Sequence, residues 1–266
     1  SNNTVFADNK GNIAYWHGNF LPKRDAKYDW SKPVDGSTTA TAWKGYHTVD
    51  ESLHIYNPEN GWLQNCNSTP FTVAGKYSPK RTDYANYLAP DGENFRGINA
   101  VRVLDEEKKY NIDKVIKAGY DTRLAAFEVL VPALINSYEK TTVTGDTTYR
   151  HLKEVIDILK KWDYRCGENS IATTLAVEWG QKLLPLINKA KDTNDQVEKV
   201  KYLAANATGA ELVDPMLAVI KELHKNFGKW QVPWGEINRF QRISNNIEYK
   251  FDDSKPSIPV GFASAT

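Results

Sequence analysis

The side chains best suited to chemistry gather between Tyr56 and Pro70, in the run Tyr-Asn-Pro-Glu-Asn-Gly-Trp-Leu-Gln-Asn-Cys-Asn-Ser-Thr-Pro. The amide groups of Asn65 and Asn67 can donate hydrogen bonds to a carbonyl oxygen that gains negative charge. They do so without carrying a charge of their own. Asparagine beside proline and glycine is also the usual composition of a turn. Residue types alone therefore leave two interpretations, a plain turn and a loop that binds an oxyanion.

Other catalytic and metal-binding patterns are missing from the sequence. The histidines (His17, His47, His54, His151 and His224) show neither HExxH nor paired spacing, which argues against a zinc site. Cys66 and Cys166 stand 100 positions apart and form no CxxC pair. They form either one disulfide or two buried thiols, and the thiols are favoured because free cysteine is commonly buried. No GxGxxG motif or P-loop occurs.

Charge and hydropathy exclude several partners. The 266 residues carry a formal net charge of +1, which gives no reason to expect nucleic acid or an acidic membrane surface. No apolar run approaches the roughly 20 residues that cross a bilayer, and no signal-peptide pattern opens the sequence. The hydrophobic content of 41% suffices for one large domain or two smaller ones.

Short strands are expected to position the loop in residues 1–90, which are rich in glycine, proline, asparagine and aromatic residues. Apolar runs predict strands at Thr4–Ala7, Ile13–Trp16 and Trp62–Gln64. The connection Asp8–Asn12 contains Gly11 and predicts a hairpin turn. Because an isolated hairpin is marginal in water, these strands are expected to pair with other chain, including chain outside this sequence.

Helices are expected in residues 91–229. Apolar positions recur at three- and four-residue spacing in the runs Phe95–Leu104, Leu124–Ile135, Leu152–Leu159, Ile171–Leu183 and Leu212–Leu223. Ser170 is the expected N-cap of one of these helices. Pro215 is expected in the first turn of the last one, where proline is tolerated. Proline and aromatic residues return in 230–266, which predicts loop and strand.

Three segments resemble the β-chain of penicillin-acylase-type hydrolases, which belong to the N-terminal nucleophile (Ntn) class. Ala7–Tyr15 resembles the pattern AD-x-x-GNI-x-Y of that family. Trp43–Tyr46 followed by Tyr56–Pro70 resembles W-K-G … NP-x-x-G-[YFW]-[IVL]-x-x-x-N-x-x-P, the most specific match. The remaining matches are the arginine pair Arg96 and Arg102, Trp162-Asp163, and Trp234–Phe240, which resembles a motif of acylases that take lipopeptides and acyl-homoserine lactones.

The resemblance implies an α+β fold, as a fragment of the αββα Ntn core. A β-rich part at 1–90 would carry the oxyanion-hole loop. A mainly helical region at 91–229 and an extended segment at 230–266, returning toward the core, would follow. The parent protein is expected to be periplasmic or secreted.

The resemblance also implies a mechanism. In the family an N-terminal serine attacks an amide carbonyl with its own α-amine as base, and an asparagine amide stabilises the tetrahedral intermediate. The aligned asparagine is Asn67, and Asn65 resembles a second asparagine that orders the same loop. Arg96 matches an arginine that helps hold the polar network of the site, against the alternative of an ordinary solvated helix residue.

Ser1-Asn2-Asn3 is similar to the start of the family's nucleophile segment. The segment Ala7–Tyr15 follows it, however, and in the family that hairpin stands far downstream of the nucleophile. We therefore expect that Ser1 is not the nucleophile and that the chain is an interior fragment of the β-chain, inactive alone. Its expected partners are a small acyl amide with a hydrophobic acyl chain and the rest of the same precursor, the α-chain and the remaining β-chain.

The chemistry implied by the resemblance requires no cofactor. The resemblance is compatible with a structural calcium ion in the full-length enzyme. Asp83 is either a ligand of that ion or an ordinary exposed loop residue. A rival hypothesis of another class is a non-catalytic binding module. Its aromatic platform for sugar or peptide would be built from four tryptophans (Trp16, Trp30, Trp43 and Trp62).

Overall fold

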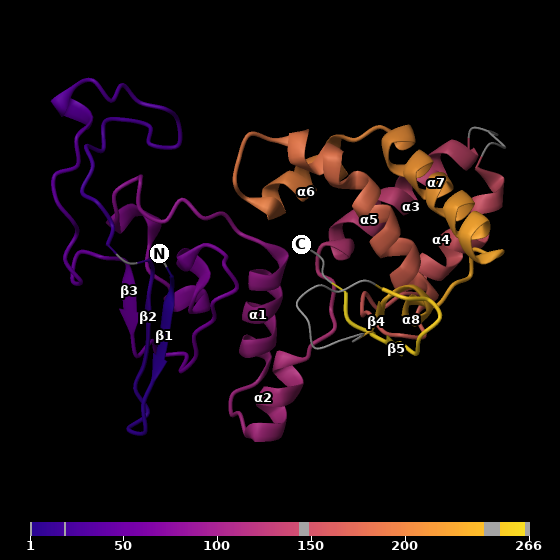
Figure 1. The fold of residues 1–266 in the computed structure, drawn as a ribbon, viewed down its shortest axis with the longest axis horizontal. Coiled ribbons are helices and arrows are strands. Elements are labelled where there is room, and N and C mark those ends of the chain that lie inside the picture. The colour runs from indigo at the N-terminus through magenta and orange to yellow at the C-terminus, as the bar shows by residue number, and fades with distance from the viewer. Residues whose placement is uncertain (1, 19, 144–148, 242–250, 264–266) are drawn as a thin grey trace. The chain divides into compact units, whose positions relative to one another are not determined.

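The computed structural model describes residues 2–18, 20–143, 149–241 and 251–263 (Figure 1). The chain divides into two compact units. The first comprises Ser1–Tyr120 with Thr193–Gln196, and the second comprises Asp121–Asp192 with Val197–Thr266. Domain boundaries at residues 90 and 229 stay a prediction from composition and resemblance, whereas the spatial division falls after Tyr120.

The first unit is built on a small antiparallel sheet of β1 (Thr4–Ala7), β2 (Ile13–Trp16) and β3 (His54–Tyr56), in the order β1-β2-β3. Thr4 pairs with Trp16, and Trp16 pairs with His54. The predicted hairpin is confirmed with its predicted strand limits. All four residues of β1 are exposed, and among the described residues β1 pairs with β2 alone.

The hairpin turn forms for local reasons. The Asp8 carboxylate accepts hydrogen bonds from the backbone N–H groups of Lys10 and Asn12, both at 2.9 Å. Gly11 adopts a φ of +86°, which is the left-handed region that glycine enters without strain. Asp8 and Gly11 therefore specify the turn, and the apolar runs on either side extend it into strands.

Two expectations for residues 1–90 are wrong. Trp62–Gln64 forms no strand, because it runs extended beside Val73 with a backbone hydrogen bond only from Gln64 N to Val73 O (2.9 Å). The third strand is His54–Tyr56, whose three residues are too few to show an alternating pattern. The region is also less β-rich than expected, since most of it is loop and four 3₁₀ turns, η1 to η4 (Thr39–Thr41, Pro70–Thr72, Gly75–Tyr77 and Arg81–Asp83).

A small apolar core lies under the sheet. Its buried members are Tyr15, Leu53, Val73, Ala74 and Ala89. The two helices of this unit follow in the chain as α1 (Phe95–Glu106) and α2 (Ile112–Gly119). Each begins at an asparagine N-cap, Asn94 for α1 and Asn111 for α2. The core fixes the sheet and the 60–78 region that carries the asparagine loop.

The second unit is helical. It contains α3 (Phe127–Val143), a 3₁₀ turn η5 (Arg150–Leu152), α4 (Lys153–Lys160), α5 (Ile171–Ala190), most of α6 (Gln196–Asn206), α7 (Gly209–Phe227) and α8 (Trp234–Ile237), with a two-stranded ladder of β4 (Arg239–Phe240) and β5 (Ile258–Pro259). The central helix α5 buries Trp179 completely, and its indole N–H donates to Leu212 O of α7 at 2.8 Å. The predicted N-cap Ser170 is confirmed, because its Oγ accepts from Thr173 N at 3.0 Å.

Two expectations for the second unit need correction. Pro215 lies in the second turn of α7, because a capping box between Thr208 and Glu211 starts the helix at Gly209. The part expected to be extended contains the short helix α8 as well as β4 and β5. Among the described residues no single helix is long and apolar enough to cross a membrane. Only α6 and α7 taken together, bent by 103°, meet the length and composition criteria.

Candidate functional site

Asn67 stands exposed in the loop between Gln64 and Pro70. Its φ is +53°, a left-handed conformation that asparagine tolerates better than most residues. Its side-chain amide forms no hydrogen bond with any residue in the described part of the chain. The backbone conformation agrees with a turn at this residue, and the oxyanion role of its amide stays a prediction.

Asn65 orders the same loop. Its Oδ1 accepts from the backbone N–H of Asn67 at 3.3 Å and from Nδ2 of Asn3 at 3.2 Å. Asn3 in turn accepts from Gly18 N through its own Oδ1 at 3.1 Å. The residues before β1 and after β2 are thus connected to the asparagine loop.

A polar cavity of about 310 Å³ lies beside Asn67. It is lined by Asn67, Pro90, Asp91, Gly92, Glu93, Asn94, Asn194 and Gln196. Backbone N–H of Glu93 donates to Asp195 Oδ2 at 3.1 Å, and Gln196 N donates to Glu93 O at 2.9 Å. Nothing in the sequence indicated that a segment about 100 residues downstream forms one wall of this cavity, because no local motif joins the two segments.

Two carboxylates in the cavity wall have opposite pKa shifts. Burial raises the pKa of Glu93 above its ordinary value. The hydrogen bond from His17 lowers the pKa of Asp91, with the two groups 3.1 Å apart (Nε2 to Oδ2). Burial therefore disfavours the ionised form of Glu93, whereas the contact with His17 favours the ionised form of Asp91.

His17 connects this wall to the sheet. It is buried, and its Nδ1 lies 2.9 Å from the Tyr15 hydroxyl. With the ring proton on Nε2, Tyr15 donates to the ring and the ring donates to Asp91. Burial raises the pKa of the Tyr15 hydroxyl, so this phenol stays protonated as the donor. The sequence showed only that His17 lacks a zinc-type partner, and its role in connecting the sheet to the wall was missed.

Arg96 is exposed in the first turn of α1 and forms no hydrogen bond within the described residues. Burial raises the pKa of the neighbouring Cys66 thiol, and the positive charge of Arg96 partly opposes that increase. The guanidinium therefore lies near the loop of Asn67. Its role in a polar network stays a prediction.

The remaining residues singled out in the sequence lie as follows. Cys66 and Cys166 are both free thiols. Asp83 is exposed at the end of the 3₁₀ turn η4. Across the described residues no group of three or more His, Cys, Asp or Glu side chains is placed to hold a metal ion. Asp83 alone does not make a calcium site, and no chemical step is assigned to a metal. Ser1 lies outside the described residues.

The four tryptophans of the rival hypothesis do not share one environment. Trp43 is 60% exposed, whereas the other three are partly buried. Trp16 stacks on His54, and the Trp30 indole N–H donates to Asp25 O at 2.7 Å. Trp43 contacts Tyr46 edge-on. These separate contacts give no support for a common stacking platform.

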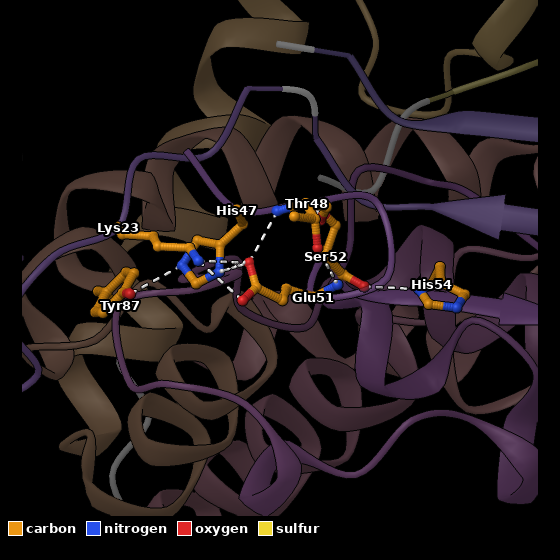
Figure 2. Close-up of polar contacts among 7 residues, drawn as sticks. All are labelled: Lys23, His47, Thr48, Glu51, Ser52, His54 and Tyr87. Carbon is orange, nitrogen blue, oxygen red and sulfur yellow. Dashed lines mark hydrogen bonds and ion pairs between the residues drawn. The ribbon is translucent and has the colours of Figure 1, made fainter. Parts of the chain in front are cut away.

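A second polar cluster lies near the end of the long connection between β2 and β3 (Figure 2). It includes Lys23, His47, Thr48, Glu51 and Tyr87. The Glu51 carboxylate pairs with Lys23 Nζ at 2.8 Å and accepts from Thr48 N at 2.9 Å. His47 Nδ1 lies 3.7 Å from the same carboxylate, and its Nε2 lies 2.9 Å from the Tyr87 hydroxyl. The hydrogen bond from Lys23 lowers the pKa of Glu51 to about 2. Most of these groups bind one another, which stabilises the loop, and His47 Nδ1 is a buried atom of the cluster without a hydrogen bond to any described residue.

A larger cavity of about 450 Å³ lies where the hairpin faces α1 and α2. Its walls are apolar, with Phe6, Ile13, Trp62, Val103 and Val115 among them, and Tyr110 is its only titratable side chain within the described residues. The oxyanion chemistry expected from the sequence resemblance requires polar groups that stabilise developing charge. The smaller polar cavity beside Asn67 is therefore the better candidate site.

Comparison with known proteins decides the family. The sequence profile of the family described as penicillin amidase matches residues 1–261. The chain belongs to the penicillin amidase family. It is 37% identical over 166 residues to penicillin G acylase from Escherichia coli, which is 60% of this chain and 18% of that protein.

A solved structure supports the same fold. The thermostable penicillin G acylase from Alcaligenes faecalis matches with a TM-score of 0.55 and 17% identity, over 85% of this chain and 47% of that chain. At that identity the match concerns the fold alone. The expected α+β class is confirmed in its coarse form, as a mostly helical penicillin amidase chain with a small sheet. The chain spans less than half of either relative.

Proposed function

We propose that this penicillin amidase chain is part of an enzyme that hydrolyses the amide bond between a hydrophobic acyl group and an amine. Asn67 supplies an amide donor to the oxyanion hole. Arg96 supports the polar surroundings of that donor. The serine nucleophile comes from a part of the protein outside this sequence, so the chain alone has no activity.

The free Asn67 amide carries this proposal. Its position matches the family motif, its side chain is exposed without a hydrogen-bond partner in the described residues, and it borders a polar cavity. When a nucleophile adds to an amide carbonyl, negative charge develops on the carbonyl oxygen. A neutral NH₂ group held at that oxygen stabilises the charge more strongly in the transition state than in the ground state.

The proposal extends to partners and location. The substrate is a small acyl amide, and the chemistry requires no cofactor. The remaining portions of the same precursor complete the site and the αββα core, in keeping with the 18% of the Escherichia coli relative that this chain spans. The parent protein is periplasmic or secreted.

The test replaces Asn67 by alanine in the full-length protein that contains this chain. Acyl p-nitroanilides of increasing chain length serve as substrates. Removing one oxyanion donor is expected to lower kcat by about 10²–10³ with little change in KM.

The matched control is Asn206→Ala. Asn206 is an exposed asparagine near the end of α6 in the other compact unit, and its Nδ2 donates to Tyr202 O at 2.8 Å. This variant is expected to keep full kcat. An Asn67→Ala enzyme with unchanged kcat on every cleaved substrate would refute the oxyanion role, and turnover by residues 1–266 alone would refute the claim that the nucleophile lies elsewhere.

A further inference from the structure

Asn94 does two things at the start of α1. As the N-cap, its Oδ1 accepts from Gly97 N at 2.9 Å. Its Nδ2 donates to the backbone carbonyl of Cys66 at 3.0 Å. The acceptor half of this arrangement is ordinary capping, which serine or aspartate performs equally well. The donor half requires a second polar atom with a hydrogen, which the asparagine NH₂ provides, which ionised aspartate lacks, and which serine lacks because its single hydroxyl oxygen already serves as the cap.

A second asparagine cap among the described helices lacks the second contact. Asn111 caps α2 through Oδ1, which accepts from Lys114 N at 2.9 Å. Its Nδ2 has no partner among the residues that the structure describes. The two caps have the same acceptor geometry and differ in the donor, so Asn111 isolates what Asn94 adds.

The Asn94 side-chain NH₂ binds the peptide group that precedes Asn67, and the orientation of that peptide determines the φ of Asn67. The carbonyl of Cys66 and the N–H of Asn67 belong to one planar peptide group. Asn94 holds its oxygen at 3.0 Å, and Asn65 Oδ1 holds its N–H at 3.3 Å. This peptide is thus held at both polar atoms by asparagine side chains from two separate segments. Rotation of the peptide would change the φ of Asn67 away from +53° and redirect its side chain.

Contacts of the two residues that follow Asn67 restrict movement of the rest of the loop. Ser68 is buried and lies so close to α1 that a Cβ on Gly97 would meet its Oγ at 2.5 Å. Thr69 N donates to Gly92 O at 3.0 Å. The loop is therefore fixed on both sides of Asn67, and Asn94 supplies the contact to the peptide preceding it that comes from outside the loop.

We propose that Asn94 is a positioning residue for Asn67, because its Nδ2 fixes the Cys66–Asn67 peptide and so aims the Asn67 amide. This inference rests on the proposed oxyanion role of Asn67. Asn94 touches no reacting atom itself. Its effect is expected in kcat, since a displacement of about 1 Å in a group that stabilises the transition state can cost up to about 10²-fold in rate.

The experiment uses Asn94→Ser and Asn94→Asp in the full-length protein, with Asn111→Ser as the matched control. All three variants keep a capping oxygen, so their thermal unfolding midpoints are expected to stay close to wild type. Both Asn94 variants are expected to lower kcat on an acyl p-nitroanilide by about tenfold, with KM changed less than about twofold. Asn111→Ser is expected to leave kcat and KM unchanged.

A double variant separates positioning from a general structural defect. If Asn94 acts through Asn67, Asn94→Ser causes no further loss of kcat in an Asn67→Ala background. Wild-type kcat in both Asn94 variants, or the same fold loss in both backgrounds, would overturn the inference while leaving the oxyanion role intact. Full kcat in Asn67→Ala would overturn the proposed function, and this inference with it.

Discussion

Replacing Gly97 by alanine tests how closely α1 packs on the asparagine loop. At an open helical position this change stabilises a protein by about 0.5–1 kcal/mol, since glycine loses more backbone freedom on folding. At Gly97 the new methyl group would lie 2.5 Å from Oγ and 2.7 Å from Cβ of Ser68. Carbon atoms pack at roughly 3.5–4.0 Å, so one of the two residues has to move.

The magnitude follows from what is able to move. Ser68 is 4% exposed, and its side chain is too short to swing away without backbone displacement. Overpacking of this kind costs about 1–3 kcal/mol. After subtraction of the helix-propensity gain of about 0.5–1 kcal/mol, the net destabilisation is about 1 kcal/mol. Because Ser68 follows Asn67 directly, kcat is expected to fall as well.

Gly119, the last residue of α2, provides the control. A Cβ there meets no atom within 4 Å, so Gly119→Ala is expected to keep or slightly raise the unfolding midpoint. The assay is thermal unfolding of the full-length protein followed by circular dichroism, with kcat measured on the same samples. A midpoint for Gly97→Ala that equals or exceeds that of Gly119→Ala would refute the close packing of α1 on Ser68.

Two further predictions concern pH and capping. The hydrogen bond from His17 depresses the pKa of Asp91, so their contact contributes stability above about pH 4 and loses it as pH falls through the folded-state pKa. His17→Ala is expected to lower the unfolding midpoint at pH 7 and to flatten its acid dependence, and an unchanged acid limb in midpoints measured from pH 7 to pH 2.5 would contradict this. Thr208→Ala removes the capping box of α7 and is expected to cost about 1 kcal/mol. Denaturant unfolding checks the second prediction, which fails if the midpoint is unchanged.

The parts of the fold that the sequence predicted are those with local causes. The hairpin depends on Asp8 and Gly11 within one turn, and the start of α5 depends on Ser170 binding a backbone N–H three residues later. Pro215 was misplaced because the first turn of α7 is set by Thr208, outside the apolar pattern that was used. Strand β3 was missed because three residues show no periodicity.

The candidate site divides in the same way. Asn67 was found through a motif whose residues are adjacent in the chain. The cavity beside it depends on contacts of the Glu93 backbone with the Asp195 carboxylate and with the backbone N–H of Gln196. These contacts join segments about 100 residues apart, so they leave no local pattern in a single sequence. Asn94 shows an intermediate case, since its capping role was open to prediction and its contact with the Cys66 carbonyl was not.

The peptide before Asn67, which is hydrogen-bonded at both its N–H and its carbonyl, also affects how the sequence of this loop can evolve. Asn65 and Asn94 each bind one polar atom of that peptide. If one of them is replaced, the other is the remaining side chain that restricts rotation of the peptide. If Asn67 has the proposed role, that role depends on a group of three asparagines drawn from two segments. A lineage that lost Asn94 would be expected to acquire another donor to the Cys66 carbonyl before residue 65 became free to vary.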